Sequence, residues 1–175
     1  MPRTALLASA ALLALAGCST VADLPTERLG SATLSMANGT PVGTAQLLAS
    51  GDRLSLAAAL TGVPEGAHGF HLHTTGKCQA PDFSSAGGHL NPLGKVHGTL
   101  DPDGSHFGDL PNIVIGPNRS GTLSADLAGN RAQVLDWLFD ADGTAVVLHA
   151  GADDYRTDPS GNAGSRIACG VLRPA

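Results

Sequence analysis

The chain has 175 residues, enough for one domain with a sizeable core and too few for two domains of ordinary size. Its 23 glycines and 11 prolines, with only 14% charged residues, are typical of a turn-rich, all-β protein. Acidic residues outnumber basic ones by 15 to 10, and the formal net charge is −5. This balance argues against a nucleic-acid partner, which needs a basic face, and against broad attraction to anionic lipid.

Residues 1–17 are typical of an export signal rather than of a folded domain. Arg3 supplies a positive charge, and residues 5–16 form an apolar run that is shorter than the roughly 20 residues needed to span a bilayer. The run ends in Leu15-Ala16-Gly17-Cys18, which resembles the lipobox of bacterial lipoproteins. An ordinary secretory signal with an incidental cysteine is the alternative interpretation.

The lipobox resemblance implies an exported, membrane-anchored lipoprotein in which acylated Cys18 is the first mature residue. We therefore divide the chain into a lipoprotein signal peptide (residues 1–17), a lipid-anchored tether (residues 18–29) and one folded domain (residues 30–175). The domain then faces the cell envelope or periplasm. Both a monomer and a homodimer are compatible with the sequence.

Three cysteines are an odd number for an exported protein. Assigning Cys18 to the lipid leaves Cys78 and Cys169 as one pair in an oxidising compartment, where a disulfide is expected. The chain-entropy model gives roughly 4–5 kcal/mol as an upper figure for a loop of about 90 residues. The sequence therefore predicts a disulfide between these two cysteines.

Alternating apolar residues and turn signals such as Asn38-Gly39 predict eight short strands. They are expected at residues 31–37, 42–49, 53–60, 67–73, 109–115, 122–127, 144–149 and 167–172. Residues 131–140 fit either a short helix or a packed connection, and Trp137 is interpreted as packing. Long loops over residues 74–108 and 150–165 are expected to be functional, because structureless loops of that length are rare in compact domains. The pattern predicts an antiparallel sandwich or barrel with Greek-key connections.

Histidines are concentrated in one region of the chain. Six of the seven lie between His68 and His106, and the seventh is His149. His71 and His73 are two residues apart, so on a strand they project from the same face. The candidate metal ligands are His71, His73, His89, His97, His106, Asp109 and His149.

A single first-row metal takes about four such donors, so the candidate set predicts two metal sites. A set made wholly of imidazoles suits copper, and a set with one carboxylate suits zinc. His106 and Asp109 can converge with His97, whereas His149 can join the pair on residues 67–73. His89 lies between the two groups in sequence and, as a bridging imidazolate, would complete both sites.

Several separate motifs resemble copper/zinc superoxide dismutases in their order and spacing, most of all the exported bacterial branch. They are Gly69-Phe70-His71-Leu72-His73, Gly88-His89-Leu90-Asn91-Pro92, His97-Gly98, His106-Phe107-Gly108-Asp109-Leu110 and Gly161-Asn162-Ala163-Gly164-Ser165-Arg166-Ile167-Ala168-Cys169-Gly170. The resemblance covers about residues 30–173. It implies a flattened eight-stranded Greek-key β-barrel. It also implies an enzyme that disproportionates superoxide to dioxygen and hydrogen peroxide with a redox-cycling copper and a histidine-bridged zinc.

The same resemblance implies a role for each site residue. Copper would be held by His71, His73, His89 and His149, and zinc by His89, His97, His106 and Asp109. His68 would brace the site without binding metal. Asp153, preferred over the adjacent Asp154, would accept hydrogen bonds from His71 and His97. Arg166 would dock the superoxide anion and, with His89, serve in catalysis. Cys78 and Cys169 match the disulfide of the family.

Loop 150–165 departs from the lysine-based steering of the anion that the family pattern implies. This loop has Arg156 as its only basic residue, so Lys77 and Lys95 are the candidates for local attraction of an anion.

The main alternative function is that of a non-catalytic periplasmic copper- and zinc-binding protein for storage or delivery. A zinc hydrolase would need a free general base, and a lipid-tethered structural domain would not need these loops. The presence of Arg166 and of a full zinc set favours the dismutase.

Overall fold

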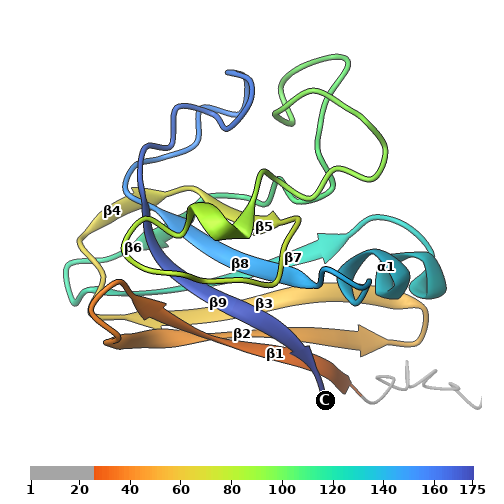
Figure 1. Cartoon of the computed structure of the whole chain (residues 1–175), viewed down its shortest axis with the longest axis horizontal. Coiled ribbons are helices and arrows are strands. Elements are labelled where there is room, and N and C mark those ends of the chain that lie inside the picture. The colour runs from red at the N-terminus through yellow and green to blue at the C-terminus, as the bar shows by residue number, and fades with distance from the viewer. Residues whose placement is uncertain (1–25) are drawn as a thin grey trace, which may run out of the picture.

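The computed structural model describes residues 26–175, which form an antiparallel β-barrel with two long loops projecting from one side (Figure 1). The predicted signal peptide, Cys18 and most of the predicted tether lie outside these residues. The strands are β1 (Glu27–Met36), β2 (Pro41–Ser50), β3 (Arg53–Thr61), β4 (Gly66–His68), β5 (Phe70–His73), β6 (Ile113–Ile115), β7 (Ser120–Leu127), β8 (Thr144–His149) and β9 (Arg166–Pro174). A short 3₁₀ helix, η1 (Ser84–Ala86), and one α-helix, α1 (Arg131–Leu138), complete the fold. Neither helix has the length and apolar composition needed to cross a bilayer.

Strands β1, β2 and β3 form a meander whose alternating residues face the core. Leu34, Leu47 and Leu56, one from each strand, are fully buried, as the period-two pattern predicts. Strand β1 begins at Glu27 rather than at residue 31, so residues 27–29, which we had assigned to the tether, belong to the barrel. They pair with the end of β2, and the Leu29 carbonyl accepts a hydrogen bond from the amide of Ala175.

The strand order confirms the predicted all-β class. Seven strands form one curled sheet in the order β5-β8-β9-β1-β2-β3-β7, with every neighbouring pair antiparallel. The last strand, β9, lies between β8 and the first strand, β1, which requires non-sequential crossovers of the Greek-key kind. Strands β4 and β6 pair with each other, and they lead directly into the sheet's two edge strands, β5 and β7.

Two predicted strands differ from those observed, and the structure decides between the two alternatives left open for residues 131–140. The strand expected over residues 67–73 is divided at Gly69, whose amide and carbonyl bond to Gly151 and His149 outside the regular ladder. The strand expected to begin at Asp109 begins only at Ile113, because Asn112 bonds to Tyr155 and Asp153 of the 150–165 loop instead. Residues 131–138 form helix α1, which is one of the two alternatives. At the start of this helix, the backbone amide of Gln133 donates a hydrogen bond to the side chain of Asn130, the N-cap residue.

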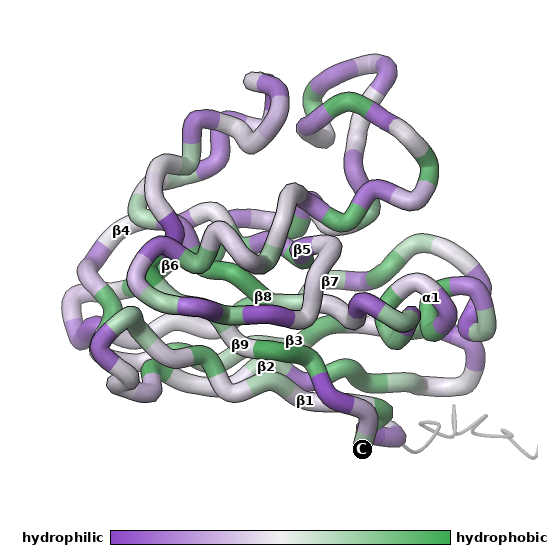
Figure 2. Tube along the Cα trace, in the orientation of Figure 1, coloured by the Kyte–Doolittle hydropathy of each residue, from purple (hydrophilic) through white to green (hydrophobic). Residues whose placement is uncertain are grey.

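Strand β8 is buried on both faces and is apolar along most of its length (Figure 2). Its inward residues, Val146 and Leu148, belong to the barrel core. Its outward residues, Ala145 and Val147, pack with Phe83, Ala86 and Cys169 in a second apolar cluster. The loop over residues 74–108, which contains Phe83 and Ala86, is therefore anchored on the outside of the barrel, on the same face of β8 that carries His149.

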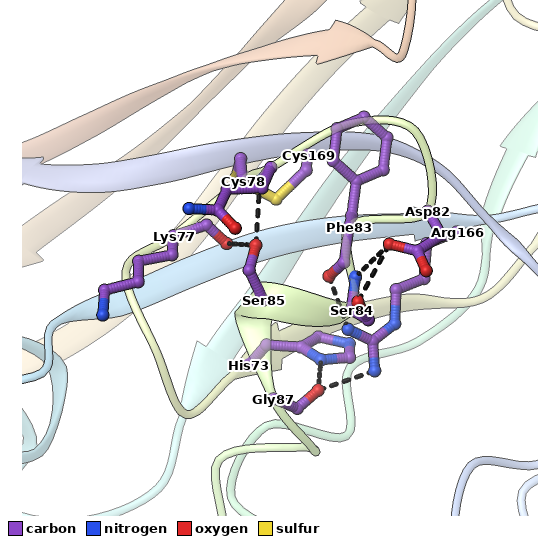
Figure 3. Close-up of a disulfide and its surroundings, with 11 residues drawn as sticks. His73, Lys77, Cys78, Asp82, Phe83, Ser84, Ser85, Gly87, Arg166 and Cys169 are labelled. Carbon is purple, nitrogen blue, oxygen red and sulfur yellow. Dashed lines mark hydrogen bonds between the residues drawn. A yellow bond between two sulfur atoms is a disulfide. The ribbon is translucent and has the colours of Figure 1, made fainter.

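A disulfide between Cys78 and Cys169 ties this loop to β9 (Figure 3). The two residues are 91 positions apart, so the bridge closes a large part of the chain. It joins the second apolar cluster directly to the strand that carries Arg166. The cysteine pair predicted from the sequence is thus present.

Candidate metal centre

Four histidines meet on the outer face of the barrel, beside the anchored loop. His71 and His73 project from β5, and His149 lies at the end of the adjacent strand β8. His89 comes from the long loop and pairs through its backbone with His73. One ring nitrogen of each residue lies within 4.8 Å of the others, and all four side chains are buried. This is the set that the sequence motifs assign to copper.

A second set of four donors lies beside the first. The Nδ1 atoms of His89, His97 and His106 lie 2.7, 3.1 and 3.2 Å from Oδ1 of Asp109. Nδ1 of His106 is 3.5 Å from Nδ1 of His89. Three ring nitrogens and one carboxylate oxygen thus converge on a common point, as four-coordinate zinc requires.

Backbone pairing with the free edge of β5 brings the second set together. The Leu72 amide donates to the Gly108 carbonyl, the Leu90 amide donates to the Leu72 carbonyl, and the Gly108 amide donates to the Leu90 carbonyl. These bonds place the segments carrying His89 and Asp109 directly beside the strand that carries His71. Two loop segments without regular structure are therefore fixed by a rigid strand.

The chemistry of the buried atoms tests whether metals fit these sets. Five buried side-chain polar atoms of residues 26–175 have no hydrogen-bond partner. Four of them belong to the first histidine set: His71 Nδ1, His73 Nε2, His89 Nε2 and His149 Nε2. A buried polar atom without a partner costs about 1–3 kcal/mol, so four such atoms at one point call for a ligand. An imidazole-binding metal satisfies all four.

His89 is the residue that the two sets share. Its Nδ1 faces Asp109 in the second set, and its Nε2 is one of the partnerless atoms of the first. Because an imidazole can bind one metal through each nitrogen, this orientation suits a bridge. The resulting arrangement has four donors in each set.

Asp153 connects the outer nitrogens of one histidine from each set. His71 Nε2 donates to Asp153 Oδ2 at 2.7 Å, and His97 Nε2 donates to Oδ1 at 3.0 Å. Burial raises the pKa of Asp153, but the hydrogen bonds from the two rings outweigh it and hold the pKa below its ordinary value. Gly161 adopts a φ of 66° and passes so close that any side chain there would overlap the carboxylate. Asp154, by contrast, is exposed and bonds within its own loop to Thr157.

His68 lies behind the metal sets and has no free nitrogen. Its Nδ1 is 2.8 Å from the carbonyl of His149, and its Nε2 is 3.0 Å from the carbonyl of Pro64. The side chain therefore ties the end of β8 to the turn that precedes β4. This position is compatible with the predicted brace.

Arg166 stands at the edge of a cavity of about 430 Å³ that opens onto the first histidine set. Its NH1 donates to the Phe83 carbonyl at 2.7 Å, and its NH2 donates to the Gly87 carbonyl at 2.6 Å. The Gly87 carbonyl also accepts from His73 Nδ1, so one backbone oxygen orients both the arginine and a candidate ligand (Figure 3).

Sequence reasoning missed three residues that line this cavity: Asn91, Pro159 and Ser160. Asn91 belongs to the Gly88-His89-Leu90-Asn91-Pro92 motif, and Pro159 and Ser160 lie in the 150–165 loop that was expected to be functional, but no sequence signal singled out any of the three. Conversely, Lys77 and Lys95, the candidates for local attraction of an anion, do not line the cavity, and neither does Arg156.

Burial keeps three histidines of the first set, His73, His89 and His149, neutral in the metal-free protein. Desolvation lowers the pKa of His73 to about 2 and the pKa values of His89 and His149 to about 4 each. Burial raises the pKa of Asp109, but hydrogen bonding to His89 and to the Gly98 amide leaves it well below its ordinary value. Neutral imidazoles and a charged carboxylate are the protonation states that metals bind.

These features define a binuclear metalloprotein, with an all-imidazole set suited to copper beside a mixed set suited to zinc. The family model for copper/zinc superoxide dismutase matches residues 42–172. The chain is 43% identical to superoxide dismutase [Cu-Zn] 2 of Aquifex aeolicus over 148 residues, which cover 77% of this chain and 81% of the relative. It is 35% identical to the Caulobacter vibrioides enzyme over 175 residues, or 95% of this chain and 98% of that one.

A solved structure supports the same assignment. The crystal structure of a superoxide dismutase-like protein from Bacillus subtilis superposes with a TM-score of 0.75 at 36% identity, and covers 82% of this chain and 97% of that one. The chain therefore belongs to the copper/zinc superoxide dismutase family. Membership confirms the family, the enzyme class and the two cofactors that the sequence motifs predicted.

We expect the metal-free protein to lose stability as the pH falls from about 6.5 to about 4. The pKa values of His73, His89 and His149 are lower in the folded state than in the unfolded chain, so unfolding takes up protons in this window. Urea unfolding at a series of pH values measures this effect. The copper- and zinc-loaded protein is the comparison, since bound metal competes with protons and should delay the loss. A urea midpoint that stays constant or rises on acidification would contradict the prediction.

Proposed function

We propose that this chain disproportionates superoxide, and that one of its two donor sets binds copper and the other binds zinc. Copper is assigned to His71, His73, His89 and His149, and zinc to His89, His97, His106 and Asp109. The observation that carries the proposal is the group of four partnerless ring nitrogens, three of which belong to residues that line one cavity together with Arg166. A redox metal held there would be reached by a small molecule from solvent.

The reaction turns two superoxide anions and two protons into one dioxygen and one hydrogen peroxide. When bound, copper supplies a one-electron acceptor and donor, and zinc supplies a fixed positive charge that keeps its ligands oriented. The chain itself must supply a proton-carrying atom at the cavity. His89 Nε2 is directed toward the first set, on a residue that lines the cavity. We assign it a proton-carrying role: whenever this nitrogen is not bound to copper, it would hold one proton and release it to the peroxide product.

Arg166 is assigned to dock the anion. It lines the cavity together with three candidate copper ligands, and its guanidinium is held by two backbone carbonyls rather than by a carboxylate. Its charge therefore remains available to an incoming anion. A guanidinium oriented in advance attracts and orients superoxide without reorganisation during the reaction.

Two further residues are assigned supporting roles. Asp153 accepts hydrogen bonds from His71 and His97, which fixes the tautomers of one ligand from each set and couples their orientations. His68 holds the backbone at His149 in place. Neither residue is assigned as a metal ligand.

We further propose that the protein is exported and tethered to a membrane through a lipid on Cys18. The lipobox-like sequence supports this anchor, and the disulfide is typical of oxidising compartments outside the cytoplasm. Since β1 begins at Glu27, the tether would be residues 18–26. A homodimer is compatible with these assignments, as is a monomer.

Replacing Arg166 with alanine should lower the rate of dismutation by about 10- to 100-fold, because a charged hydrogen bond is worth about 1.5–3 kcal/mol. Copper and zinc contents should remain normal, since Arg166 belongs to neither donor set. Arg156→Ala is the matched control, because this arginine does not line the cavity. Equal rates for Arg166→Ala and wild type at full metal content would refute the docking role. A wild type that holds both metals but does not dismutate superoxide would instead favour a storage or delivery protein.

Replacing Cys18 with serine should move the protein from the membrane fraction to the soluble fraction, because serine cannot take the lipid. Fractionation after expression in a bacterium with lipoprotein processing, together with incorporation of labelled fatty acid, measures the outcome. Ser19→Ala is the control and should stay with the membrane. A Cys18→Ser protein that remains membrane-bound would exclude the lipid anchor.

A further inference from the structure

The orientation of Arg166 depends on a short segment of the long loop. Its two terminal amino groups donate to the carbonyls of Phe83 and Gly87, at the two ends of helix η1. Arg166 is half-buried, and no carboxylate of residues 26–175 lies within ion-pair distance of it. The conformation of residues 83–87 therefore decides where the guanidinium points (Figure 3).

This segment begins with an unfavourable backbone conformation. Phe83 has φ 55° and ψ 21°, in the left-handed region, which costs a bulky residue of this kind about 1 kcal/mol or more. The buried Phe83 ring is fixed in the second apolar cluster, but that contact alone does not aim the carbonyl. Two backbone hydrogen bonds also hold the turn: the Phe83 amide donates to the Gln79 carbonyl at 3.0 Å, and the Ala86 amide donates to the Phe83 carbonyl at 3.1 Å.

Asp82 adds a side-chain restraint to these backbone bonds. Its Oδ1 accepts hydrogen bonds from the Ser84 amide at 3.0 Å and from Ser84 Oγ at 2.9 Å. A carboxylate that bonds to the backbone two residues further on closes a local turn, here around Phe83. The carboxylate thereby stabilises the geometry in which the Phe83 carbonyl meets Arg166.

The same carboxylate places a negative charge near the guanidinium. Asp82 is exposed, and it stands beside Arg166 in Figure 3 without forming a direct ion pair. The hydrogen bond from the Ser84 amide, together with a smaller contribution from the Ser84 hydroxyl, lowers the pKa of Asp82 below its ordinary value. The carboxyl group is therefore ionised at neutral pH. Its field opposes that of Arg166 at the mouth of the cavity.

We propose that Asp82 is a positioning residue that sets the affinity of the cavity for small anions through two opposing effects. Its hydrogen bonds to Ser84 orient Arg166 and so favour anion binding, whereas its charge disfavours it. The proposal rests on the proposed function, because it takes Arg166 to be the group that docks the anion. The two effects are separable, since asparagine keeps the Oδ1 acceptor without the charge and alanine removes both.

The experiment measures the dissociation constant of azide, a small anion that binds copper, by absorbance titration of the full chain loaded with copper and zinc. Asp82→Asn should bind azide about two- to fivefold more tightly than wild type at low ionic strength, by a surface Coulomb estimate. The gain should shrink when salt is raised to about 0.15 M, because an exposed charge is screened. Asp82→Ala should bind azide more weakly than Asp82→Asn, since its turn is no longer held.

Asp136→Asn is the matched control, because it removes one exposed acid from helix α1 and should leave azide affinity unchanged. Metal content and the thermal midpoint of each variant test for general damage. An Asp82→Asn protein with wild-type affinity at low salt would overturn the charge effect, and equal affinities for Asp82→Asn and Asp82→Ala would overturn the orienting effect. A loaded wild type that binds no azide would overturn both.

Azide affinity does not depend on turnover, so the two proposals can fail separately. If the predicted order of affinities appears in a protein that does not dismutate superoxide, the proposed function fails and the role of Asp82 remains. If dismutation is fast but wild type and both Asp82 variants bind azide with equal affinity, the role of Asp82 fails and the proposed function remains.

Discussion

The structure depends on one electrostatic constraint, which is that six imidazoles and a carboxylate are buried together with their lone pairs aimed at one another. In a metal-free protein these groups cannot all be satisfied, and four ring nitrogens have no partner. Desolvation also prevents the rings of His73, His89 and His149 from taking up protons near neutral pH. Two metal ions remove both penalties, so the cluster makes physical sense as a binuclear site.

The rest of the fold supplies a rigid frame for this cluster. The outer faces of β5 and β8 carry three of the histidines, and the free edge of β5 pairs with the loop segments that carry His89 and Asp109. The disulfide and the second apolar cluster hold the same long loop from its other side. Two carbonyls of that loop then orient Arg166 at the cavity. The loop over residues 74–108, which has little regular structure, is thus fixed by contacts to the three strands β5, β8 and β9.

The fold was predictable from the sequence wherever alternation of apolar and polar residues alone determines a strand. Alternation located β2 and β3 within a residue or two and placed His71 and His73 on one face. Spacing and ligand chemistry also indicated two metal sets before any geometry was known. Long-range contacts decided the rest: Gly69 divides a strand because it bonds to Gly151, and residues 27–29 join β1 because β2 extends to meet them. The carbonyl contacts of Arg166 and the cavity residues Pro159 and Ser160 left no local signal.

The central claim is that His89 belongs to both metal sites, and the copper and zinc affinities of His89→Ala test it most directly. We predict that this variant loses affinity for both metals, by more than the 10- to 100-fold cost typical of losing a supporting contact. His106→Ala, which removes a donor from the second set alone, should weaken zinc binding and leave copper binding close to that of wild type. A His89→Ala protein that binds copper as tightly as wild type does would contradict the shared-ligand account.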